Sequence, residues 1–374
     1  MRLAVFAASA GIGGALVACA PAISQCTPEI VAQVGGGGED LLLDERGYLY
    51  LLGPRLGVVD VREPTRPVLT RINDPYLGGP YFSLGLTGET LIALHGDDFQ
   101  WALISGFDVS DPVEPTVIFD RILTADSYAS ASGERFFQLA FGSPALAVWD
   151  FTAPVPTARG VFIPLPGECR AIASRGTTAF ASTDAGVVVV DGADPAAPEV
   201  RSVIPILDEA SRSAFDGSLL IVGTQFGPTY TVDVRDIDNP RILGSVDRAA
   251  FATAAGPRFA VVIEGESVVV IDTTDPTEPS VAGSLAMTGL RPEFVQVLDG
   301  FAFVAASRTT YVIDISGCLP CLADLDGSGG LDIFDFLEFQ RLFDAGDIRS
   351  DFNRDGASDF ADFLAFFNAF GAGC

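Results

Sequence analysis

Residues 176–200 read Gly-Thr-Thr-Ala-Phe-Ala-Ser-Thr-Asp-Ala-Gly-Val-Val-Val-Val-Asp-Gly-Ala-Asp-Pro-Ala-Ala-Pro-Glu-Val. This stretch contains two short apolar runs, 177–181 and 187–190, which a turn separates and an Asp-Pro-x-x-Pro segment follows. Runs of β-branched and aromatic residues bounded by Gly, Pro and Asp are typical of β-strands joined by tight turns. The stretch therefore predicts a hairpin, a proline-rich turn and a further strand that starts at Glu199.

The apolar run that ends in Asp recurs seven times, with a mean period of about 42 residues. Each copy combines a hairpin, the Asp-terminated strand, a turn and a final strand, which is typical of one four-stranded β-propeller blade. We therefore predict an all-β, seven-bladed β-propeller. A β-sandwich is the alternative, but seven copies in phase argue against it. The runs end at Asp60, Asp108, Asp150, Asp191, Asp233, Asp272 and Asp314.

The repeat resembles the LVIVD repeat family, which is named for runs such as Val188-Val189-Val190-Asp191, over roughly residues 27–316. The match is uneven. Arg62-Glu63-Pro64 replaces the Asp-Pro turn after Asp60, and the second Asp-Pro is missing after Asp150. The resemblance implies the same propeller fold for residues 26–317 and does not identify a ligand.

The last repeat stops short, because no closing strand follows Asp314 before the composition changes. The missing strand occurs at the other end of the chain, where residues 27–34 match residues 197–204. We therefore expect the N-terminal strand to complete the seventh blade and close the ring, so that no large sheet edge stays open. The repeat frame then makes Cys26 and Cys318 neighbours, which predicts a Cys26–Cys318 disulfide.

The composition excludes several classes of chemistry. All 22 basic residues are Arg, the only histidine is His95, and the formal net charge is −27. A P-loop and Schiff-base chemistry both need a Lys, and a multi-histidine metal site needs several His. A chain this acidic is repelled by nucleic acid and by anionic lipid. We therefore expect no nucleic-acid partner.

The first 25 residues are typical of a secretory signal peptide. Arg2 precedes an apolar run over 3–18, which is too short to span a membrane, and small residues follow it. Residues 16–19 also look like a bacterial lipobox, so lipidation of Cys19 and ordinary cleavage between Cys19 and Cys26 are the alternatives. No second apolar stretch is long enough for a transmembrane span. We expect a secreted or cell-surface protein whose cysteines can form disulfides.

Residues 318–374 form a different domain with two acidic loops, 324–335 and 351–362. Both loops have oxygen-bearing side chains at positions 1, 3 and 5, Gly at position 6 and a carboxylate at position 12, which suits Ca²⁺. Position 7 would supply a backbone carbonyl. The tail resembles the dockerin family, whose duplicated loop–helix units also use Asp at position 12, so we expect two Ca²⁺ sites. The expected ligands are Asp324, Asp326, Ser328, Gly330 and Asp335 in one loop, and Asp351, Asn353, Asp355, Ala357 and Asp362 in the other.

An apolar helix is expected after each loop, over 336–343 and 363–370, and the two helices should pack through their Phe and Leu residues. The remaining aromatic residues form either core or a partner-binding face. Cys321 and Cys374 bracket this domain, so we expect a disulfide between them. A zinc site at Cys318 and Cys321 is the alternative, but it lacks further ligands.

A candidate ligand face lies in the second repeat, where His95, Asp97, Asp98 and Trp101 occur together. Such residues suit acid–base chemistry or sugar stacking, and an exposed polar loop is the alternative interpretation. Cys169 has no evident partner. Four further residues near blade starts could line the central channel or be solvated at random: Arg170, Arg212, Arg248 and Arg291.

Two functions remain open. The first is an exported, non-enzymatic binding or scaffold protein, in which the propeller is an interaction platform for a protein or glycan. Its tail would dock it to a cohesin-like protein or a surface anchor. The second is a component of extracellular polysaccharide degradation, which rests only on the best-known setting of dockerins. No nucleophile–base arrangement emerges from the sequence.

Overall fold

The computed structural model describes residues 26–373, apart from 36–39, 53–55, 73–80, 98–100, 124–128, 133–134, 141–143, 152–161 and 207. The expected signal peptide with Cys19 lies outside the described residues, as do Asp98 and Cys374. No helix in the described part of the chain is long and apolar enough to cross a membrane.

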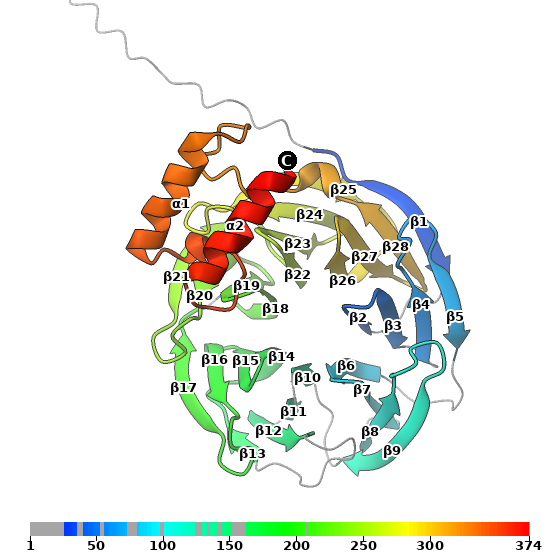
Figure 1. The fold of residues 1–374 in the computed structure, drawn as a ribbon. Helices are drawn as coiled ribbons and strands as arrows, with labels where there is room; N and C mark the ends of the chain where they lie inside the picture. Colours follow the sequence, from blue (N-terminus) through cyan, green and yellow to red (C-terminus); the bar gives the residue numbers. More distant parts are fainter. Residues whose placement is uncertain are drawn as a thin grey trace, which may run out of the picture.

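Seven four-stranded antiparallel sheets surround a central channel, which confirms the predicted seven-bladed β-propeller (Figure 1). The first strand of each blade lies innermost and the fourth outermost.

Blade 1 contains β2 (Asp40–Leu43), β3 (Tyr48–Leu52), β4 (Leu56–Asp60) and β5 (Val68–Ile72). Blade 2 contains β6 (Tyr81–Thr87), β7 (Thr90–Asp97), β8 (Trp101–Asp108) and β9 (Thr116–Leu123). Blade 3 contains β10 (Ala129–Ser132), β11 (Arg135–Ala140), β12 (Ala145–Asp150) and β13 (Phe162–Pro164). Blade 4 contains β14 (Cys169–Arg175), β15 (Thr178–Thr183), β16 (Gly186–Asp191) and β17 (Glu199–Ile204); blade 5 contains β18 (Ala210–Asp216), β19 (Leu219–Thr224), β20 (Thr229–Asp233) and β21 (Arg241–Val246); blade 6 contains β22 (Ala252–Gly256), β23 (Phe259–Glu264), β24 (Ser267–Asp272) and β25 (Ser280–Ala286); blade 7 contains β26 (Pro292–Leu298), β27 (Phe301–Ala306), β28 (Thr309–Asp314) and β1 (Glu29–Gly35).

The ring closes as the repeat frame predicts. Strand β1 pairs antiparallel with β28, with Glu29 opposite Asp314 and Gly35 opposite Thr309. The Cys26–Cys318 disulfide is present beside this pairing. The first and last strands of the propeller therefore share one blade, and the closing bond joins them covalently.

The recurring Asp at the end of each third strand has a local structural role. In the six blades where the structure describes the residue two positions later, its Oδ1 accepts a hydrogen bond from that residue's backbone N–H, as when Ala193 donates to Asp191 at 2.9 Å. This arrangement is an Asx-turn, which reverses the chain after the strand. The motif that defines the repeat is therefore explained by turn formation.

Apolar side chains fill the spaces between neighbouring blades. Each of the seven blade–blade contacts has its own buried cluster, and the one between blades 4 and 5 contains Phe180 and Val222. Because both faces of each sheet are covered, middle strands can carry continuous apolar runs rather than an alternating pattern. Strand β16 illustrates this, since Val187 to Val190 are all fully buried.

The tail contains two helices, α1 (Ile333–Ala345) and α2 (Phe360–Ala372), and two short 3₁₀ turns, Ser316–Cys318 and Ile348–Ser350. Both helices begin three residues before the predicted ranges, because Asp332 and Asp359 cap them. Each cap is reciprocal, since the side chain of the third helical residue accepts a hydrogen bond from the cap's backbone N–H. The sequence prediction missed this capping box.

The two helices share a small aromatic core. The rings of Phe339 and Phe366 stack with centroids 4.5 Å apart, and both side chains are buried. Phe336 and Phe352 pack around this pair. The expectation that part of the Phe-rich pattern forms the contact between the helices is therefore confirmed, and the tail is a small helical domain.

Candidate metal loops and ligand face

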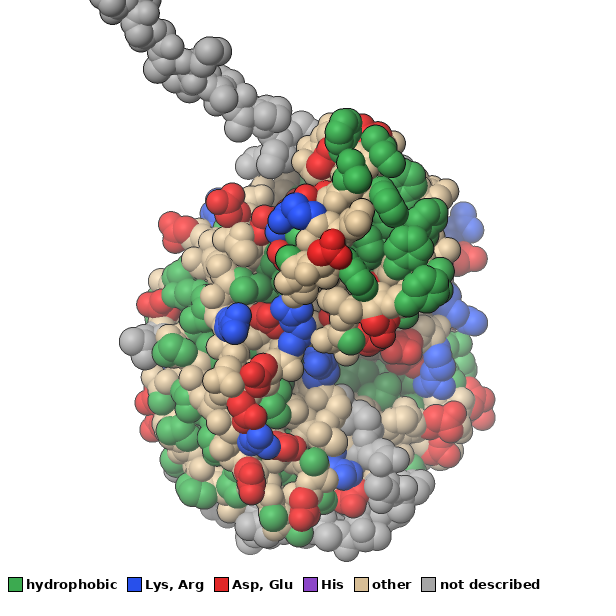
Figure 2. Space-filling model, turned by 60° about the vertical axis from the view of Figure 1, so that its left-hand side comes forward, with side chains coloured by type: hydrophobic (Ala, Val, Ile, Leu, Met, Phe, Trp, Pro, Cys, Tyr) green, Lys and Arg blue, Asp and Glu red, His purple; other side chains and the backbone are tan. Residues whose placement is uncertain are grey.

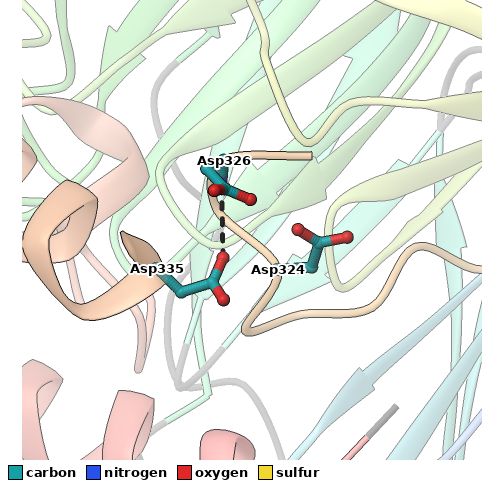
Figure 3. Close-up of side chains that lie close together, drawn as sticks. All are labelled: Asp324, Asp326 and Asp335. Atoms are coloured by element: carbon teal, nitrogen blue, oxygen red, sulfur yellow. Dashed lines mark hydrogen bonds between the residues drawn. The ribbon is translucent and has the colours of Figure 1, made fainter. Parts of the chain in front are cut away.

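The first acidic loop brings three of its predicted ligands together. Asp324 and Asp326 precede α1, and Asp335 lies in its first turn, so the helix start folds the loop back on itself (Figure 3). Carboxylate oxygens of these three residues lie within 4.8 Å of one another. The backbone N–H of Ser328 donates to Asp324 and Asp326, at 3.0 and 2.9 Å. Oxygen atoms at this separation can share one ion whose ligand distances are about 2.3–2.6 Å.

The other two predicted ligands of this loop contact each other. The Ser328 hydroxyl donates to the carbonyl oxygen of Gly330 at 3.0 Å. Asp335 is fully buried, and its oxygens accept from the N–H groups of Leu325 at 2.8 Å and Asp332 at 2.9 Å. Position 12 therefore holds the loop closed as well as offering a carboxylate.

The second loop has the same frame. Asp362 is fully buried and accepts from the N–H groups of Phe352 and Asp359, both at 2.7 Å. Asn353 Nδ2 donates to Asp355 Oδ2 at 3.0 Å, and Ala357 N–H donates to Asp355 Oδ1 at 2.9 Å. Hydrogen bonds therefore connect the loop before α2 to Asp362 in the first turn of that helix.

Asp351 carries the clearest sign that this loop suits a cation. It is buried, and its Oδ2 accepts from the N–H of Gly356 at 3.0 Å. Its Oδ1 is buried with no hydrogen-bond partner among the described residues. Burial raises the pKa of this carboxyl, and the nearby Asp362 adds to the effect. A buried carboxylate oxygen without a partner is costly unless a cation meets it, so the residues present fit a hard, oxygen-seeking ion such as Ca²⁺.

The tail packs directly on the propeller, a contact that the sequence analysis did not foresee. Arg354 in the second loop forms an ion pair with Asp216 of blade 5, with Nη1 and Oδ1 2.7 Å apart. Arg258 of blade 6 donates to the carbonyl oxygen of Arg349 at 2.9 Å, and Arg349 pairs with Asp275 at 3.2 Å. The sequence held one signal of this contact, which is the basic residue Arg354 at position 4 of an acidic loop.

Arg258 lies at the centre of this contact. It is buried, and its guanidinium lies 4.6 Å from the ring centroid of Phe352. Burial, together with the neighbouring Arg354, lowers the pKa of Arg258 to about 10, so it remains charged at neutral pH. A charged group at this depth requires partners, which ties the tail to blade 6.

The described contacts of the tail with the propeller lie on blades 5 and 6 at one face of the ring, and we call the opposite face the open face. Its propeller contacts follow the first strand of a blade, as at Asp216, or the third strand, as at Arg235, whose guanidinium donates to Gly346 O at 3.1 Å. Because the strands are antiparallel, these connections share one face of the ring. The entry to each first strand and the link from the second to the third strand lie on the opposite face.

The residues of the predicted ligand face have different surroundings in the structure. His95 does not lie in an exposed loop: it is in β7, it is 3% exposed, and its Nε2 lies 2.7 Å from the hydroxyl oxygen of Ser105. Asp97 and Trp101 pair across the β7–β8 hairpin on the open face. Asp98 lies outside the described residues. His95 lies in a strand and not in the turn, because β7 and β8 extend farther than the turn residues suggested. The ligand face itself stays a prediction.

Arg212 is the predicted basic residue that lines the central channel. It extends from β18 toward Asp40 on β2, with Nη1 and Oδ1 3.7 Å apart, and lies 4.4 Å from the ring centroid of Phe294. Burial raises the pKa of Asp40, although Arg212 and the N–H of Leu84 oppose this shift. The channel cavity beside them has a volume of about 360 Å³. A cation and a carboxylate from blades 5 and 1 therefore meet inside the ring.

A second cavity of about 330 Å³ lies next to the channel on the open face. Arg170 pairs with Glu209 there at 3.2 Å, and Phe251 on its wall is half exposed. Of the other predicted basic residues, Arg248 pairs with Glu264 at 3.3 Å, and Arg291 directly precedes β26. The open face thus combines a hollow with charged and aromatic groups.

The cysteines outside the ring closure have different environments. Cys169 is a free, half-buried thiol at the start of β14, and burial raises its pKa to about 11. Cys321 is disulfide-bonded. Its expected partner, Cys374, lies outside the described residues.

The helices of the tail present a continuous apolar surface to solvent, at the upper right of Figure 2. Beside it a groove of about 420 Å³ is lined by Phe336, Phe343 and Phe360, among others. Some aromatic residues of the tail therefore form its core, whereas others are exposed at the surface. The large exposed side chains are Ile333, Phe334, Leu337, Phe360, Leu364 and Phe367.

No protein-family model matches the chain, and no curated protein matches it. Solved structures do resemble it. The β-propeller domain of Cps50 (Swd1) from Myceliophteria thermophila has a TM-score of 0.58 at 14% identity and covers 77% of this chain and 99% of that one. A chain of the Mitotic Checkpoint Complex has a TM-score of 0.60 at 12% identity, with 84% and 99% covered, and BamB from Moraxella catarrhalis has 0.52 at 9%, with 77% and 98% covered. At these identities the likeness supports the propeller fold alone.

Proposed function

We propose that this protein is an exported, non-enzymatic binding or scaffold protein. In this proposal, the propeller is the interaction platform, and the tail is a calcium-stabilised docking domain that attaches it to a cohesin-like protein or a surface anchor. The signal-like residues 1–25 and the disulfide at the ring closure support export to an oxidising compartment. A propeller fold suits this role, because its loops present a broad face on a rigid ring.

One observation carries the proposal most strongly: the tail packs on blades 5 and 6 at one face of the ring and leaves both the opposite face and its own apolar surface accessible. The first is the open propeller face, with the hollow beside Arg170 and Glu209. The second is the apolar surface of α1 and α2, where Leu337 and Phe360 are exposed (Figure 2). Exposed apolar patches of this kind usually mark interaction sites. Two independent surfaces are what a protein that links two partners requires.

Calcium would act in this function by ordering the tail. When bound, it would neutralise the acidic groups that surround each loop and hold the loop closed. Residues of the chain itself close the loops and start the helices. Asp335 and Asp362 close the loops through backbone hydrogen bonds, while Asp332 and Asp359 start the helices that carry the apolar surface.

The test uses the full oxidised chain. A cohesin module is immobilised on a biosensor, and binding of the chain is measured in calcium and in EGTA. Capture in calcium that is lost in Asp324→Ala and Asp351→Ala would support the docking function, and Leu337→Asp should weaken capture without changing calcium binding. A panel of plant and algal polysaccharides is incubated with the same protein. Turnover that is lost in Asp97→Asn would instead favour the polysaccharide-degradation alternative.

A further inference from the structure

The two acidic loops differ in what surrounds them. Among the described residues, the hydrogen bonds of the side chains in the loop 324–335 stay within the tail. The loop 351–362 instead faces the end of blade 5, and it contacts the connection between β18 and β19. Any ion in the second loop therefore lies beside the propeller, whereas one in the first loop does not.

The first residue of the second loop is oriented by the propeller. The hydroxyl of Ser218 donates to Asp351 Oδ2 at 3.0 Å, and both residues are buried. The same oxygen accepts from the N–H of Gly356, inside the loop. These two bonds fix the carboxylate and leave Oδ1, which is buried and lacks a hydrogen-bond partner among the described residues. A propeller side chain thus sets the position of a carboxylate that has one unused oxygen.

The fourth residue of the loop is clamped to the same connection. Arg354 pairs with Asp216 at 2.7 Å, and Asp216 is itself held by the N–H of Arg258 at 2.8 Å. Between them lies Gly217, where an added Cβ would come within 2.3 Å of the Cβ of Arg354. The loop and the connection therefore fit too closely for any side chain at position 217. Their shapes are complementary as well as their charges.

We propose that the second calcium site is a composite site, built by the loop 351–362 together with Asp216, Gly217 and Ser218 of the propeller. Ser218 and Asp216 are positioning residues, because they act on Asp351 and Arg354. Calcium binding and docking of the tail on blade 5 are then a single coupled equilibrium, and each strengthens the other by the same factor. This inference rests on the calcium-dependent tail of the proposed function. It adds that calcium binding in the second loop, and not in the first, is coupled to docking of the tail on the propeller.

The first experiment is a calcium titration by calorimetry on the full oxidised chain carrying Asp324→Ala, which leaves the second site to be measured alone. Adding Ser218→Ala should weaken that site on the order of tenfold, because loss of a partner that orients a metal ligand has an effect of this size. Arg354→Gln should weaken it in the same direction. Arg341→Gln is the matched control, since Arg341 on α1 pairs, within the described part of the chain, with Glu338 alone, and the change should leave the titration unaltered. Circular dichroism in EGTA checks that each variant keeps its strand content.

The second experiment measures hydrogen exchange of the propeller segment 214–219 with and without calcium. Calcium should protect this segment in the parent chain and in Asp324→Ala, and should give no protection in Asp351→Ala. If both loops bind calcium but Ser218→Ala and Arg354→Gln titrate like Arg341→Gln, with no change in exchange, the composite site is wrong and the calcium-dependent tail stands. If neither loop of the parent chain binds calcium, the tail function fails, and the composite site fails with it.

Discussion

Cys26 and Cys318 lie 292 residues apart in the chain, yet their Cα atoms are 5.1 Å apart and a disulfide joins them. The same end of the chain is also held by hydrogen bonds, because the N–H of Cys26 donates to the carbonyl oxygen of Ala282 in blade 6 at 3.1 Å. Cys26 therefore connects blades 6 and 7 where the ring closes. The position of this bond explains how a single outer strand can close a seven-bladed ring.

Removing this bond should destabilise the whole propeller. In a chain-entropy model a closed loop of this length contributes about 5 kcal/mol, so the double variant Cys26→Ser, Cys318→Ser should unfold at a clearly lower guanidinium concentration. Equilibrium unfolding followed by circular dichroism measures the difference. Cys169→Ser is the control and should change stability little, because that thiol is free. A non-reducing peptide map that pairs Cys26 with another cysteine would contradict the closure.

Gly283 on β25 provides the space that the closing bond needs. An added Cβ would lie 2.3 Å from Cys26 Sγ and 3.2 Å from Cys318 Sγ. Gly283→Ala should therefore lower stability by about 1–3 kcal/mol, as over-packing does elsewhere. Gly35→Ala is the matched control on β1, because an added Cβ there would have no atom of the described residues within 4 Å. Equal thermal unfolding of the two variants would show that the close approach has no energetic weight.

The Cys169 thiol should react slowly in the folded protein. Burial raises its pKa to about 11, and a raised thiol pKa lowers the fraction of reactive thiolate at any lower pH. At pH 8 alkylation by iodoacetamide should be about 100-fold slower than in the unfolded chain. The rate should rise about tenfold per pH unit until the pH nears 11. Mass spectrometry of folded and urea-unfolded protein follows both rates, and equal rates at pH 8 would refute the buried environment.

His95 should matter for stability and not for ligand binding. Its side chain is buried inside blade 2 and contacts Ser105, so His95→Ala leaves a cavity and a hydroxyl without this partner. We expect a loss of about 2–4 kcal/mol in the free energy of unfolding. Phe226→Ala is the control, because that ring is 76% exposed and its loss should cost little. A His95 variant with unchanged stability would restore the exposed-loop interpretation.

The fold could be predicted because its determinants are local and repeat in phase. In the six described cases the Asp at the strand end closes an Asx-turn with a residue two positions away, so the turn chemistry is readable in the sequence. The apolar runs mark strands whose two faces are both covered. Repetition at a constant period then sets the blade count, and the missing last strand could be matched to residues 27–34. The Cys26–Cys318 neighbourhood followed from the same frame.

The limits of the predicted helices had a different cause. The apolar pattern indicated where each helix is buried, but a helix begins where its unpaired N–H groups find acceptors. Asp332 and Asp359 provide those acceptors three residues earlier, and Asp335 and Asp362 complete the capping boxes. From their loop positions, Asp335 and Asp362 were predicted only as metal ligands. A carboxylate can serve both in a capping box and as a metal ligand, and the loop pattern indicated only the second of these roles.

From the sequence alone came the number of blades, the closure of the ring, the closing disulfide and the two acidic loops of the tail. Only the tertiary structure decided that His95 is buried, that Arg212 meets Asp40 inside the channel, and that the tail lies on blades 5 and 6. The physical reason is the separation in sequence between the residues that interact. Turns, strand runs and caps depend on residues a few positions apart, whereas the pairing of Arg354 with Asp216 and of Ser218 with Asp351 depends on the shapes of surfaces more than 130 residues apart. Such complementarity arises only when both surfaces are folded.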